Sequence, residues 1–545
     1  MRYCFIILSL WFILISFDTT AETPVKEFRG VWIATINNID WPSSPDLSVD
    51  QQKKEFIGLL NLIEQYNLNA VILQVRPAAD AFYASETEPW SWFLTGKQGK
   101  QPEPYWDPLA WIIEECHQRG LELHAWFNPF RVRNLGVYSL SSTSFAFKNP
   151  QYTCPYDQKL FLDPGYPQVR QYLVEIIAEV VKKYDIDAVH LDDYFYPYPV
   201  QNKPFPDKKS FALYGKEFYP ERVADWRRNN IDQFISGLHD TIKQIKPWVK
   251  LGISPFGVWR NIADDPSGSA GAKGMSSYDY LYADIKKWLA EGWIDYVMPQ
   301  LYWEHGNRYG DFKTLANWWG NNSYGKELYI GQALYKSTDP KANWKNHQEI
   351  GDQIKMLRQN NRINGFSFYS ISHLKKLSSQ QQNLLANNYL QQKAVPYNSR
   401  RESSPVDIEN AQTNNHFAES QLLIPDTDVL VSSLAFYSKT DSGLPVAQNI
   451  ALQRNGGGWI ISWKCEEAYD PEKVKFAIVT FQSKENGVYI RRVQAKTVNQ
   501  QYYIARNEKS HYKNKLVTIV AVNEKNEPGA ISKLFRIKGK KLTFN

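Results

Sequence analysis

Carboxylate and histidine side chains follow one face of a short apolar segment near the middle of the chain. In residues Ala188–Asp193, His190 and Asp192 share one face, and Asp193 shares the other with apolar residues. Side chains of a β-strand alternate between its two faces, so we expect His190 and Asp192 to point away from the apolar layer. A bend at the end of the strand would bring Asp193 to the side of Asp192.

Three other segments carry polar side chains with the same alternation. These sets are Gln74 and Arg76; Glu122, His124, Trp126 and Asn128; and Met298, Gln300, Tyr302 and Glu304. Buried strands seldom carry polar groups unless these have hydrogen-bond partners or a function. His124 or Gln74 alone is explained as well by a satisfied hydrogen bond in the core. Agreement across four segments, densest toward their C-terminal ends, favours one shared site there.

Two carboxyl groups at such a site suit cleavage of a glycosidic bond, in which one donates a proton and the other acts as nucleophile or base. We expect Asp192 to be ionised near His190 and Arg76, and therefore to be the nucleophile or base. Asp193 is its rival for that role. We expect Glu304 to be the acid, because aromatic rings near it would raise its pKa: Trp259, Tyr302 and Trp303. An exposed loop carboxylate is the plainer explanation of Glu304.

Histidine and carboxylate side chains also admit a metal site, as in barrel amidohydrolases or deacetylases. The candidate ligands are His124, His190, Asp192 and Asp193. The sequence has no His-x-His pair on its first strand, no HExxH motif and no G-x-S-x-G turn. We therefore predict catalysis without a metal or other cofactor.

Eight segments rich in β-branched and aromatic residues alternate with amphipathic stretches after residue 24. The predicted strands are Phe28–Ala34, Ala70–Arg76, Leu121–Asn128, Ala188–Asp193, Lys250–Pro255, Tyr296–Tyr302, Leu328–Ala333 and Gly365–Ser370. The predicted helices include Asp50–Tyr66, Pro108–Arg119, Pro167–Tyr184, Trp226–Lys246, Tyr278–Glu291 and Ile350–Asn360. Such alternation implies parallel strands joined by right-handed crossovers. Eight units match an α/β fold, the (β/α)8 barrel, better than an open doubly wound sheet, since no strand precedes a glycine-rich phosphate loop.

Further polar and aromatic residues fall at the predicted strand ends or in the loops that follow them. A substrate lying across the barrel mouth would be held there by ring stacking and hydrogen bonds. The predicted substrate-binding residues are Asn37, Arg76, His124, Trp126, Asn128, His190, Tyr194, Tyr196, Trp259, Gln300, Tyr302 and Trp303.

The composition is that of a large folded protein with many aromatic rings. The 545 residues include 19 Trp, 33 Tyr and 27 Phe, and 63 basic against 57 acidic residues give a formal charge of +6. Such a chain is not a disordered tail, a collagen-like fibre or a coiled coil. The charge is too dilute to indicate a nucleic-acid partner.

The first residues have the pattern of a secretory signal peptide. Arg2 precedes an apolar run from Phe5 to Phe17, and small residues end at Ala21. The run is shorter than the about 20 residues of a membrane span, so we expect cleavage after Ala21 and a periplasmic or extracellular protein without an integral membrane segment. A retained anchor is the alternative. The mature chain would keep three cysteines that form no metal knuckle or disulfide framework, although a bridge between the first two would suit an oxidising compartment: Cys116, Cys154 and Cys465.

The C-terminal part of the chain has a different pattern. Residues 396–440 predict a linker rich in Gln, Asn and Ser, and residues 441–540 predict short alternating strands with Trp463 in their core. This pattern resembles a fibronectin type III-like β-sandwich. It has no carboxylate or histidine cluster, so we expect a spacer or docking module that contacts an envelope protein or glycan. The barrel is predicted over residues 26–395, after a signal peptide of residues 1–21.

Several stretches match those of a known family in their order along the chain. They are EFRGVWIATINNIDWPS, NAVILQVRPAADAFYAS, WFNPFRV, LDPGYPQVRQYL, DAVHLDDYFYPYP, GISPFGVWRN and DYVMPQLYWE. From about residue 26 to 375, the chain thereby resembles the glycosyl-hydrolase-like family ten of exported bacterial proteins. The resemblance implies a (β/α)8 barrel, a glycoside hydrolase activity, and envelope glycans, peptidoglycan strands in particular, as one substrate class. The order His190-Leu191-Asp192 is also similar to the strand-four motif of α-amylase-like barrels, in which the aspartate is the nucleophile.

Two other functions fit parts of the same pattern. One is a non-catalytic glycan-binding or scaffold barrel, and the other is a metal-dependent deacetylase or amidase. A binding protein and an enzyme would both need the aromatic mouth, but only the glycosidase needs two carboxylates.

Overall fold

The computed structural model describes residue 24, residues 26–396 except 135, 343, 345 and 347, and strands with short connections between residues 448 and 544. These residues form two compact units, one N-terminal and one C-terminal. The predicted signal peptide and nearly all of the predicted linker lie outside the described residues. Among the described helices, none is both long and apolar enough to cross a membrane.

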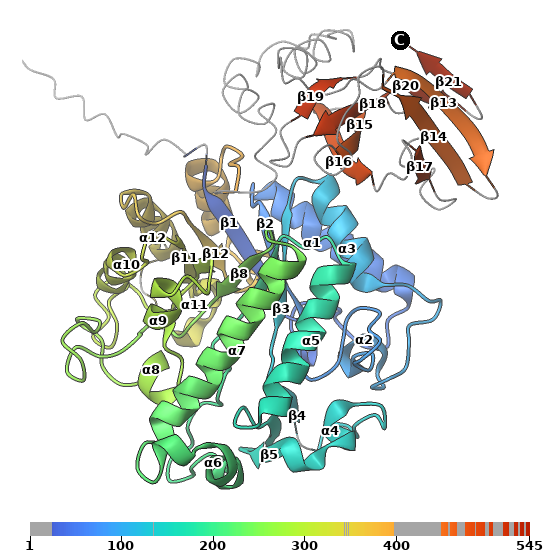
Figure 1. Ribbon diagram of the computed structural model, residues 1–545. Coiled ribbons are helices and arrows are strands. Elements are labelled where there is room, and N and C mark those ends of the chain that lie inside the picture. The colour runs from blue at the N-terminus through green and yellow to red at the C-terminus, as the bar shows by residue number, and fades with distance from the viewer. Residues whose placement is uncertain are drawn as a thin grey trace, which may run out of the picture. The chain divides into compact units, whose positions relative to one another are not determined.

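Parallel strands at eight positions close into a barrel in the N-terminal unit (Figure 1). In chain order they are β1 (Phe28–Ile33), β2 (Ala70–Arg76), β3 (Glu122–Phe127), β7 (Ala188–Leu191), β8 (Lys250–Ile253), β9 (Tyr296–Val297) with β10 (Gln300–Leu301), β11 (Glu327–Gln332) and β12 (Gly365–Phe368). β12 pairs with β1, and β9 pairs with both β8 and β11, so this sheet is closed. The predicted (β/α)8 barrel is confirmed.

A proline divides the sixth strand position into β9 and β10. Pro299 has no N–H to donate to the ladder. The amides on either side still pair, since Met298 N donates to the Ile253 carbonyl at 2.8 Å and Gln300 N donates to the Pro255 carbonyl at 3.0 Å. The predicted strand therefore occupies its expected place in the barrel with an interrupted ladder.

At least one helix follows each strand position, and the helices that precede the next strand together surround the barrel (Figure 1). They are α1 (Val49–Gln65), α3 (Pro108–Gln118), α5 (Pro167–Lys183), α7 (Val223–Ile245), α9 (Ile285–Ala290), α10 (Phe312–Asn321), α12 (Glu349–Arg358) and α14 (Ser379–Leu384). The caps explain several of the starts. Ser48 and Gln51 form a capping box before α1, and the Asp107 carboxylate accepts from an amide of the first turn of α3.

The single helix predicted over Tyr278–Glu291 is wrong. The segment contains α8 (Ser277–Tyr280) and, after a break, α9. Tyr282 adopts a left-handed backbone with φ of 55°, which a continuing α-helix excludes. The Asp284 carboxylate then accepts from the Lys287 amide at 3.3 Å and begins the second helix.

The strands alternate between two cores, as their sequence predicts. Val189 and Leu191 of β7 pack in the outer core with the helices, whereas Ala188 lies in the barrel interior. The interior is filled mainly by rings and small side chains, namely Phe28, Trp32, Ala34, Ala70, Ile72, Trp126, Ala188, Tyr296, Met298 and Tyr329. Phe28 and Tyr329 stack with ring centroids 4.0 Å apart. The barrel is therefore a packed core that supports the site above it.

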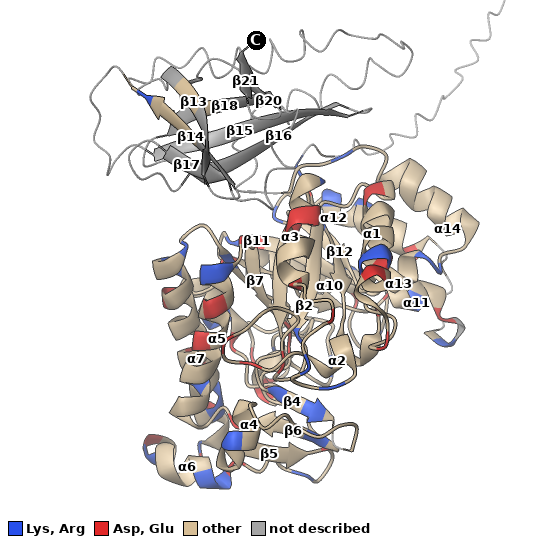
Figure 2. Cartoon of the chain, turned by 90° about the vertical axis from the view of Figure 1, so that its right-hand side faces the viewer, with Lys and Arg blue, Asp and Glu red and all other residues tan. Residues whose placement is uncertain are grey.

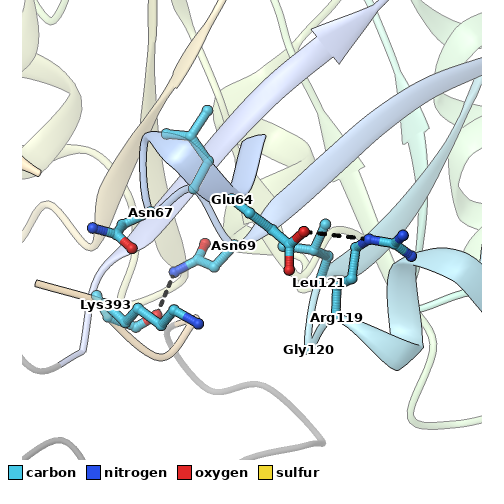
Figure 3. Close-up of a pocket in the computed structure, with 9 residues that line it drawn as sticks. Glu64, Asn67, Asn69, Arg119, Gly120, Leu121 and Lys393 are labelled. Atoms are coloured by element: carbon cyan, nitrogen blue, oxygen red, sulfur yellow. Dashed lines mark hydrogen bonds and ion pairs between the residues drawn. The ribbon is translucent and has the colours of Figure 1, made fainter. Parts of the chain in front are cut away.

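The segment after η5 (Leu385–Tyr389) closes the N-terminal end of the barrel. Lys26 forms a parallel bridge with Val395, and the Asn69 amide donates to the Ala394 carbonyl at 2.9 Å (Figure 3). A pocket of about 70 Å³ remains beside Arg119, whose guanidinium pairs with Glu64 at 3.4 Å. This pocket is smaller than the about 300–1,000 Å³ of ligand sites.

Loops at the C-terminal ends of the strands carry further short elements. After β3 the chain forms β4 (Arg131–Asn134), α4 (Phe145–Lys148), η2 (Pro150–Tyr152), β5 (Thr153–Tyr156) and β6 (Lys159–Leu162). β6 lies between β4 and β5 in a small antiparallel sheet. The other short elements are η1 (Ile36–Asn38), α2 (Trp92–Thr95), α6 (Lys208–Tyr214), η3 (Lys216–Phe218), α11 (Leu334–Thr338), η4 (Pro340–Ala342) and α13 (Ile371–Leu374).

No disulfide joins the cysteines that the structure describes. Cys116 is buried on α3, Cys154 is buried on β5, and Cys465 is partly exposed. The bridge considered between the first two is absent from the described structure.

Strands of the C-terminal unit pair into two antiparallel sheets. They are β13 (Gln448–Asn455), β14 (Gly458–Lys464), β15 (Lys475–Lys484), β16 (Gly487–Ala495), β17 (Gln501–Ile504), β18 (Leu516–Val522), β19 (Pro528–Ile531), β20 (Phe535–Lys538) and β21 (Lys541–Phe544). One sheet has the order β13-β14-β17 and the other β16-β15-β18-β20-β21, with β19 beside β18. Trp463 is 3% exposed, as expected of a core residue. The fibronectin type III-like sandwich stays a prediction.

Candidate active site

A bend directly after β7 brings two adjacent carboxylates to the barrel mouth. Asp192 and Asp193 are only 5% and 3% exposed. Asp192 keeps the interior orientation that strand alternation predicts. Asp193 departs from alternation, because the hydroxyl of Tyr198 donates to it and Gln300 also bonds to it. The structure therefore brings both candidates into one cluster.

Donors from two elements hold the Asp192 carboxylate. Trp126 Nε1 donates to its Oδ2 at 3.1 Å, and the Asn128 amide nitrogen donates to the same oxygen. The backbone N–H of Tyr194 donates to Oδ1 at 3.0 Å. Three donors on one carboxylate fix its orientation and favour its ionised form.

A hydrogen-bond chain fixes which way the Asn128 amide points. Gln74 accepts from the backbone N–H groups of Thr35 at 2.9 Å and Ile36 at 2.8 Å, so its oxygen is engaged by the loop after β1. Its amide nitrogen donates to Asn128 Oδ1. Asn128 must therefore present its NH₂ group to Asp192, as the ionised carboxylate requires.

The guanidinium of Arg131 supplies the nearest positive charge. Burial raises the pKa of Asp192 above its usual value, and the charge of Arg131 and the three donors oppose this rise. The guanidinium also lies over the Tyr194 ring, 4.6 Å from its centroid. Figure 2 shows the basic residues of β4, the strand that carries Arg131, in blue. Strand β4, in the connection after β3, thus positions the Arg131 guanidinium that stabilises the ionised form of Asp192.

Burial raises the pKa of Asp193 as it does that of Asp192, but different neighbours act on it. Burial and, next, the negative charge of Asp192 raise the pKa of Asp193 to about 7. The hydrogen bonds from Tyr198 and Gln300 oppose this rise without cancelling it. The pair therefore combines Asp192, where a cation and three donors oppose the effect of burial, with Asp193, which holds a proton up to about pH 7.

Replacing Arg131 with Met is expected to raise the pKa of Asp192, because the cation that opposes burial is lost. If Asp192 must be ionised, the acidic limb of the kcat/KM profile then moves to higher pH and activity falls most at low pH. Arg133→Met, on the same strand, is the matched control and should leave that limb in place. An unchanged limb in the Arg131 variant would show that this cation does not govern the active carboxylate.

His124 and His190 lie deeper in the barrel and share one partner. The Tyr296 hydroxyl is 2.8 Å from His124 Nδ1 and 2.7 Å from His190 Nδ1. His124 Nε2 lies 3.1 Å from the Glu122 carboxylate, so both nitrogens of His124 are engaged. Burial holds the pKa of His190 well below its usual value, and this ring is therefore neutral. The two histidines support the floor of the site, and the structure does not bring them to its surface.

Arg76 lies outside the carboxylate cluster, which corrects its expected position beside Asp192. The pairing of β2 with β3 shifts register between Gln74 and Arg76, and this bulge ends the alternation. The Arg76 guanidinium makes a bidentate pair with Glu88 at 2.7 and 2.8 Å and donates to the Asn128 carbonyl. The cation beside Asp192 is Arg131 instead.

Loss of the buried Arg76–Glu88 pair is expected to destabilise the barrel. Arg76→Met leaves the Glu88 carboxylate buried without its cation, at a loss of about 3–5 kcal/mol in the free energy of unfolding. Urea denaturation measures the loss. The double variant Arg76→Met/Glu88→Leu, which removes both charges, should recover most of it, and a double variant as unstable as the single one would contradict the explanation.

Glu304 lies in the loop after β10. It is partly exposed, its Oε1 accepts from the Asn307 amide at 3.1 Å, and its charge acts on the nearby Lys336 ammonium. Trp303 beside it packs edge-on to Phe256 at 5.6 Å. The role of Glu304 as acid stays a prediction.

The other predicted binding residues divide into two groups. One group lies around the two carboxylates with Trp126 and Asn128. The Tyr194 N–H donates to Asp192, Gln300 bonds to Asp193, and the charges of both aspartates act on Tyr302. The structure does not bring the other group to the carboxylates. Asn37 is exposed on the rim, and Trp303 lies beside Glu304. Tyr196 is 1% exposed and bonds to Asn230 of α7, and Trp259 bonds to Asp284 and stacks on Trp318.

Three residues of the cluster were not predicted. Arg131 and Tyr198 lie in the connections after β3 and β7, outside the predicted strands, where the alternation argument was not applied. Tyr369 directly follows β12 and lies near the end of the predicted strand Gly365–Ser370. It is two residues after Ser367, whose side chain points into the barrel, so strand alternation could have predicted that Tyr369 points the same way. Its ring packs 6.0 Å from Trp32 and 6.1 Å from Tyr302.

The residues of the metal alternative are engaged in other contacts. Both histidines bond to Tyr296, and the two aspartates have the donors given above. In the part of the chain that the structure describes, no group of three or more His, Cys, Asp or Glu side chains is placed to hold a metal ion.

Comparisons with known proteins place this chain in a family. Residues 27–349 match the family model described as Glycosyl hydrolase-like 10. The chain is 46% identical over 378 residues to the glycosyl hydrolase YngK of Bacillus subtilis (strain 168), a match that covers 68% of this chain and 73% of that protein. It is 35% identical over 397 residues to the glycosyl hydrolase DigH of Escherichia coli (strain K12), covering 68% of this chain and 88% of that protein.

Among solved structures, the glycoside hydrolase domain of PgaB (BpsB) from Bordetella bronchiseptica aligns with 67% of this chain and 99% of its own, at 12% identity and a TM-score of 0.44. That likeness is too low to support an argument. The family model matches more than half of the chain and both relatives match about two thirds of it, and the protein therefore belongs to the Glycosyl hydrolase-like 10 family.

Proposed function

We propose that this protein is an exported glycoside hydrolase that cleaves O-glycosidic bonds of a polysaccharide, with peptidoglycan glycan strands as one substrate class. The observation that carries the proposal is the pair of buried carboxylates at the barrel mouth, on which different neighbours act. Glycosidases need such a pair, because one group must donate a proton while the other is ionised. The family and its curated relatives support the same reaction class.

Asp192 is the nucleophile or base in this mechanism. Its donors and Arg131 stabilise the charged form, and attack on the anomeric carbon or activation of a water requires that form. Asp193 is the proton donor, because it retains its proton up to about pH 7. Glu304 is the second candidate for the acid, as a carboxyl group on the neighbouring loop.

Aromatic side chains around the carboxylates hold the sugar ring. Trp126, Tyr194, Tyr302 and Tyr369 surround the pair, and flat apolar faces pack against the C–H faces of pyranose rings. Asn128 and Gln300 add amide groups that can bond sugar hydroxyls in exchange for their present partners. The mouth thus combines stacking surfaces with a few convergent polar groups.

Export and docking complete the proposal. Residues 1–21 direct the chain to the periplasm or the cell exterior, and the C-terminal strands form a fibronectin type III-like module that contacts an envelope protein or glycan. Mass spectrometry of the mature N-terminus from a cell fractionation tests the first statement. An intact N-terminus on a membrane-bound protein would contradict it.

A polysaccharide screen that includes peptide-free peptidoglycan strands, with product masses as readout, tests the activity. Hydrolysis adds one water per bond cleaved, whereas deacetylation removes an acetyl group and leaves the chain length unchanged. We expect hydrolysis that Asp192→Asn abolishes and that a chelator leaves unchanged. Binding without cleavage, or full activity in Asp192→Asn, Asp193→Asn and Glu304→Gln alike, would overturn the proposal.

A further inference from the structure

A second cavity lies at the barrel mouth beside the carboxylates. It has a volume of about 460 Å³ and lies between α11 and the segment from Tyr369 to α13. We call it the tyrosine pocket, after its walls Tyr335 and Tyr369; Thr338, Asp339, His373 and Lys376 also line it. Its size is within the about 300–1,000 Å³ of small-molecule sites.

Tyr369 connects this pocket to the carboxylate cluster. Its ring contacts Trp32 at 6.0 Å and Tyr302 at 6.1 Å, and the charges of Asp192 and Arg131 act on its hydroxyl. A glycan with one sugar unit at Asp192 can therefore place a neighbouring unit against the other side of Tyr369.

The two tyrosine rings form a right-angled corner. Their centroids are 6.3 Å apart and their planes meet at 86°. One ring can thus face the apolar side of a pyranose while the other meets its edge, the arrangement in which aromatic rings pack best against C–H groups. Tyr302 backs the corner, with its ring 5.9 Å from that of Tyr335.

The polar groups of the pocket suit hydroxyl groups. Thr338 Oγ1 lies 2.8 Å from His373 Nδ1, so this contact orients the imidazole. Burial and the charge of Lys376 lower the pKa of His373, and the ring is therefore neutral. A neutral imidazole with one nitrogen engaged has one nitrogen left to bond a hydroxyl, which both donates and accepts.

The charges of the pocket do not favour an anion. Lys376 and Asp339 are both exposed lining residues of opposite sign. Asp40, behind the wall, is already bonded by the Ala34 N–H at 2.8 Å and the Ser370 hydroxyl at 2.8 Å. An acidic sugar would be attracted by Lys376 and repelled by Asp339, so these charges favour an uncharged occupant.

We propose that the tyrosine pocket is a subsite for an uncharged pyranose unit next to the bond that is cleaved, held by the corner of Tyr335 and Tyr369 and by His373. The assignment rests on the proposed glycan function and extends it to a second sugar unit. In this assignment, Tyr335 and His373 bind the glycan, so their substitution changes glycan affinity and leaves the surroundings of the two carboxylates as they are.

Binding to the full-length Asp192→Asn protein tests the subsite without turnover. The probes are an uncharged N-acetylglucosamine tetramer and a peptide-free peptidoglycan tetrasaccharide, whose lactyl groups carry carboxylates, each measured by titration calorimetry. Adding Tyr335→Ala should weaken binding of at least one probe about 3- to 10-fold, the effect of one lost stacking contact. His373→Ala should act in the same direction, and Tyr324→Ala, an exposed tyrosine away from the mouth, should not.

The charge of the occupant is tested by Lys376→Met. We expect less than about a twofold change in Kd for either probe. A selective loss of about tenfold or more for the peptidoglycan tetrasaccharide would overturn the uncharged occupant, because the lysine would then bind a carboxylate.

The remaining outcomes separate this subsite from the proposed reaction. Binding that Tyr335→Ala and His373→Ala leave unchanged would overturn the subsite, even if the wild-type protein hydrolyses glycans. Binding that depends on both residues, together with no turnover by the wild type, would leave the subsite standing and refute the hydrolase. No binding of either probe would overturn the subsite.

Discussion

Asp192→Asn is expected to lower kcat/KM on a cleaved glycan by about 10³–10⁴-fold, the range for loss of a positioned catalytic carboxylate. The neutral amide cannot attack a sugar or take a proton from water. The substitution keeps the size of the side chain, and Trp126 and Asn128 can still donate to its oxygen. The effect should therefore be on kcat, with substrate affinity retained.

Asp163→Asn provides the matched control for this variant. Asp163 is also a buried aspartate, 2% exposed, whose pKa burial raises to about 6, but its partners are Ser210 and Gly165 outside the carboxylate cluster. Its activity per folded molecule should be near that of the wild type. A loss as large as that of Asp192→Asn would mean that any buried aspartate of the barrel has this effect.

Asp193→Asn is expected to lower kcat/KM about 10²–10⁴-fold and to remove the basic limb of the pH profile. The pKa of Asp193 is raised to about 7, so the carboxyl is protonated below that pH and loses its proton above it. If this proton is transferred to the leaving group, wild-type activity falls as the pH rises through about 7. The asparagine has no acidic proton, so the residual activity should lack that fall.

Two further variants decide whether Asp193 is the acid. Tyr198→Phe removes the hydroxyl that donates to Asp193, so the pKa of Asp193 should rise and the basic limb should move to higher pH. Glu304→Gln should leave the limb in place. If Glu304→Gln abolishes the limb and Asp193→Asn keeps it, Glu304 is the acid, as first expected from the sequence.

Alternation along single strands was enough to predict much of the fold and part of the site. In β7 it placed Val189 and Leu191 in the outer core and turned Asp192 inward, because neighbouring side chains of any strand point to opposite faces. The same argument placed Trp126 and Asn128 beside Asp192 from a different strand. These predictions held because they depend only on local geometry and on the burial of apolar faces.

Strand alternation does not place residues where the backbone leaves the regular strand. The bulge before Arg76 turns its side chain toward Glu88, which the sequence does not indicate, and the bend after Leu191 brings Asp193 into the cluster, as the alternative named for it requires. Both irregularities depend on contacts with distant parts of the chain, so alternation along the segment cannot decide them.

The sequence by itself therefore determined the barrel, the order of its units and the identity of the two aspartates, because periodicity and apolar burial act over a few residues. Only the tertiary structure decided which neighbours act on each of them. Arg131 and Asn128 lie near Asp192. Tyr198 and Asp192 act on Asp193, so two adjacent residues of the same type have different electrostatic environments. A pKa depends on burial and on every charge and donor within a few ångströms, and those neighbours come from separate strands and loops that meet only in the folded barrel.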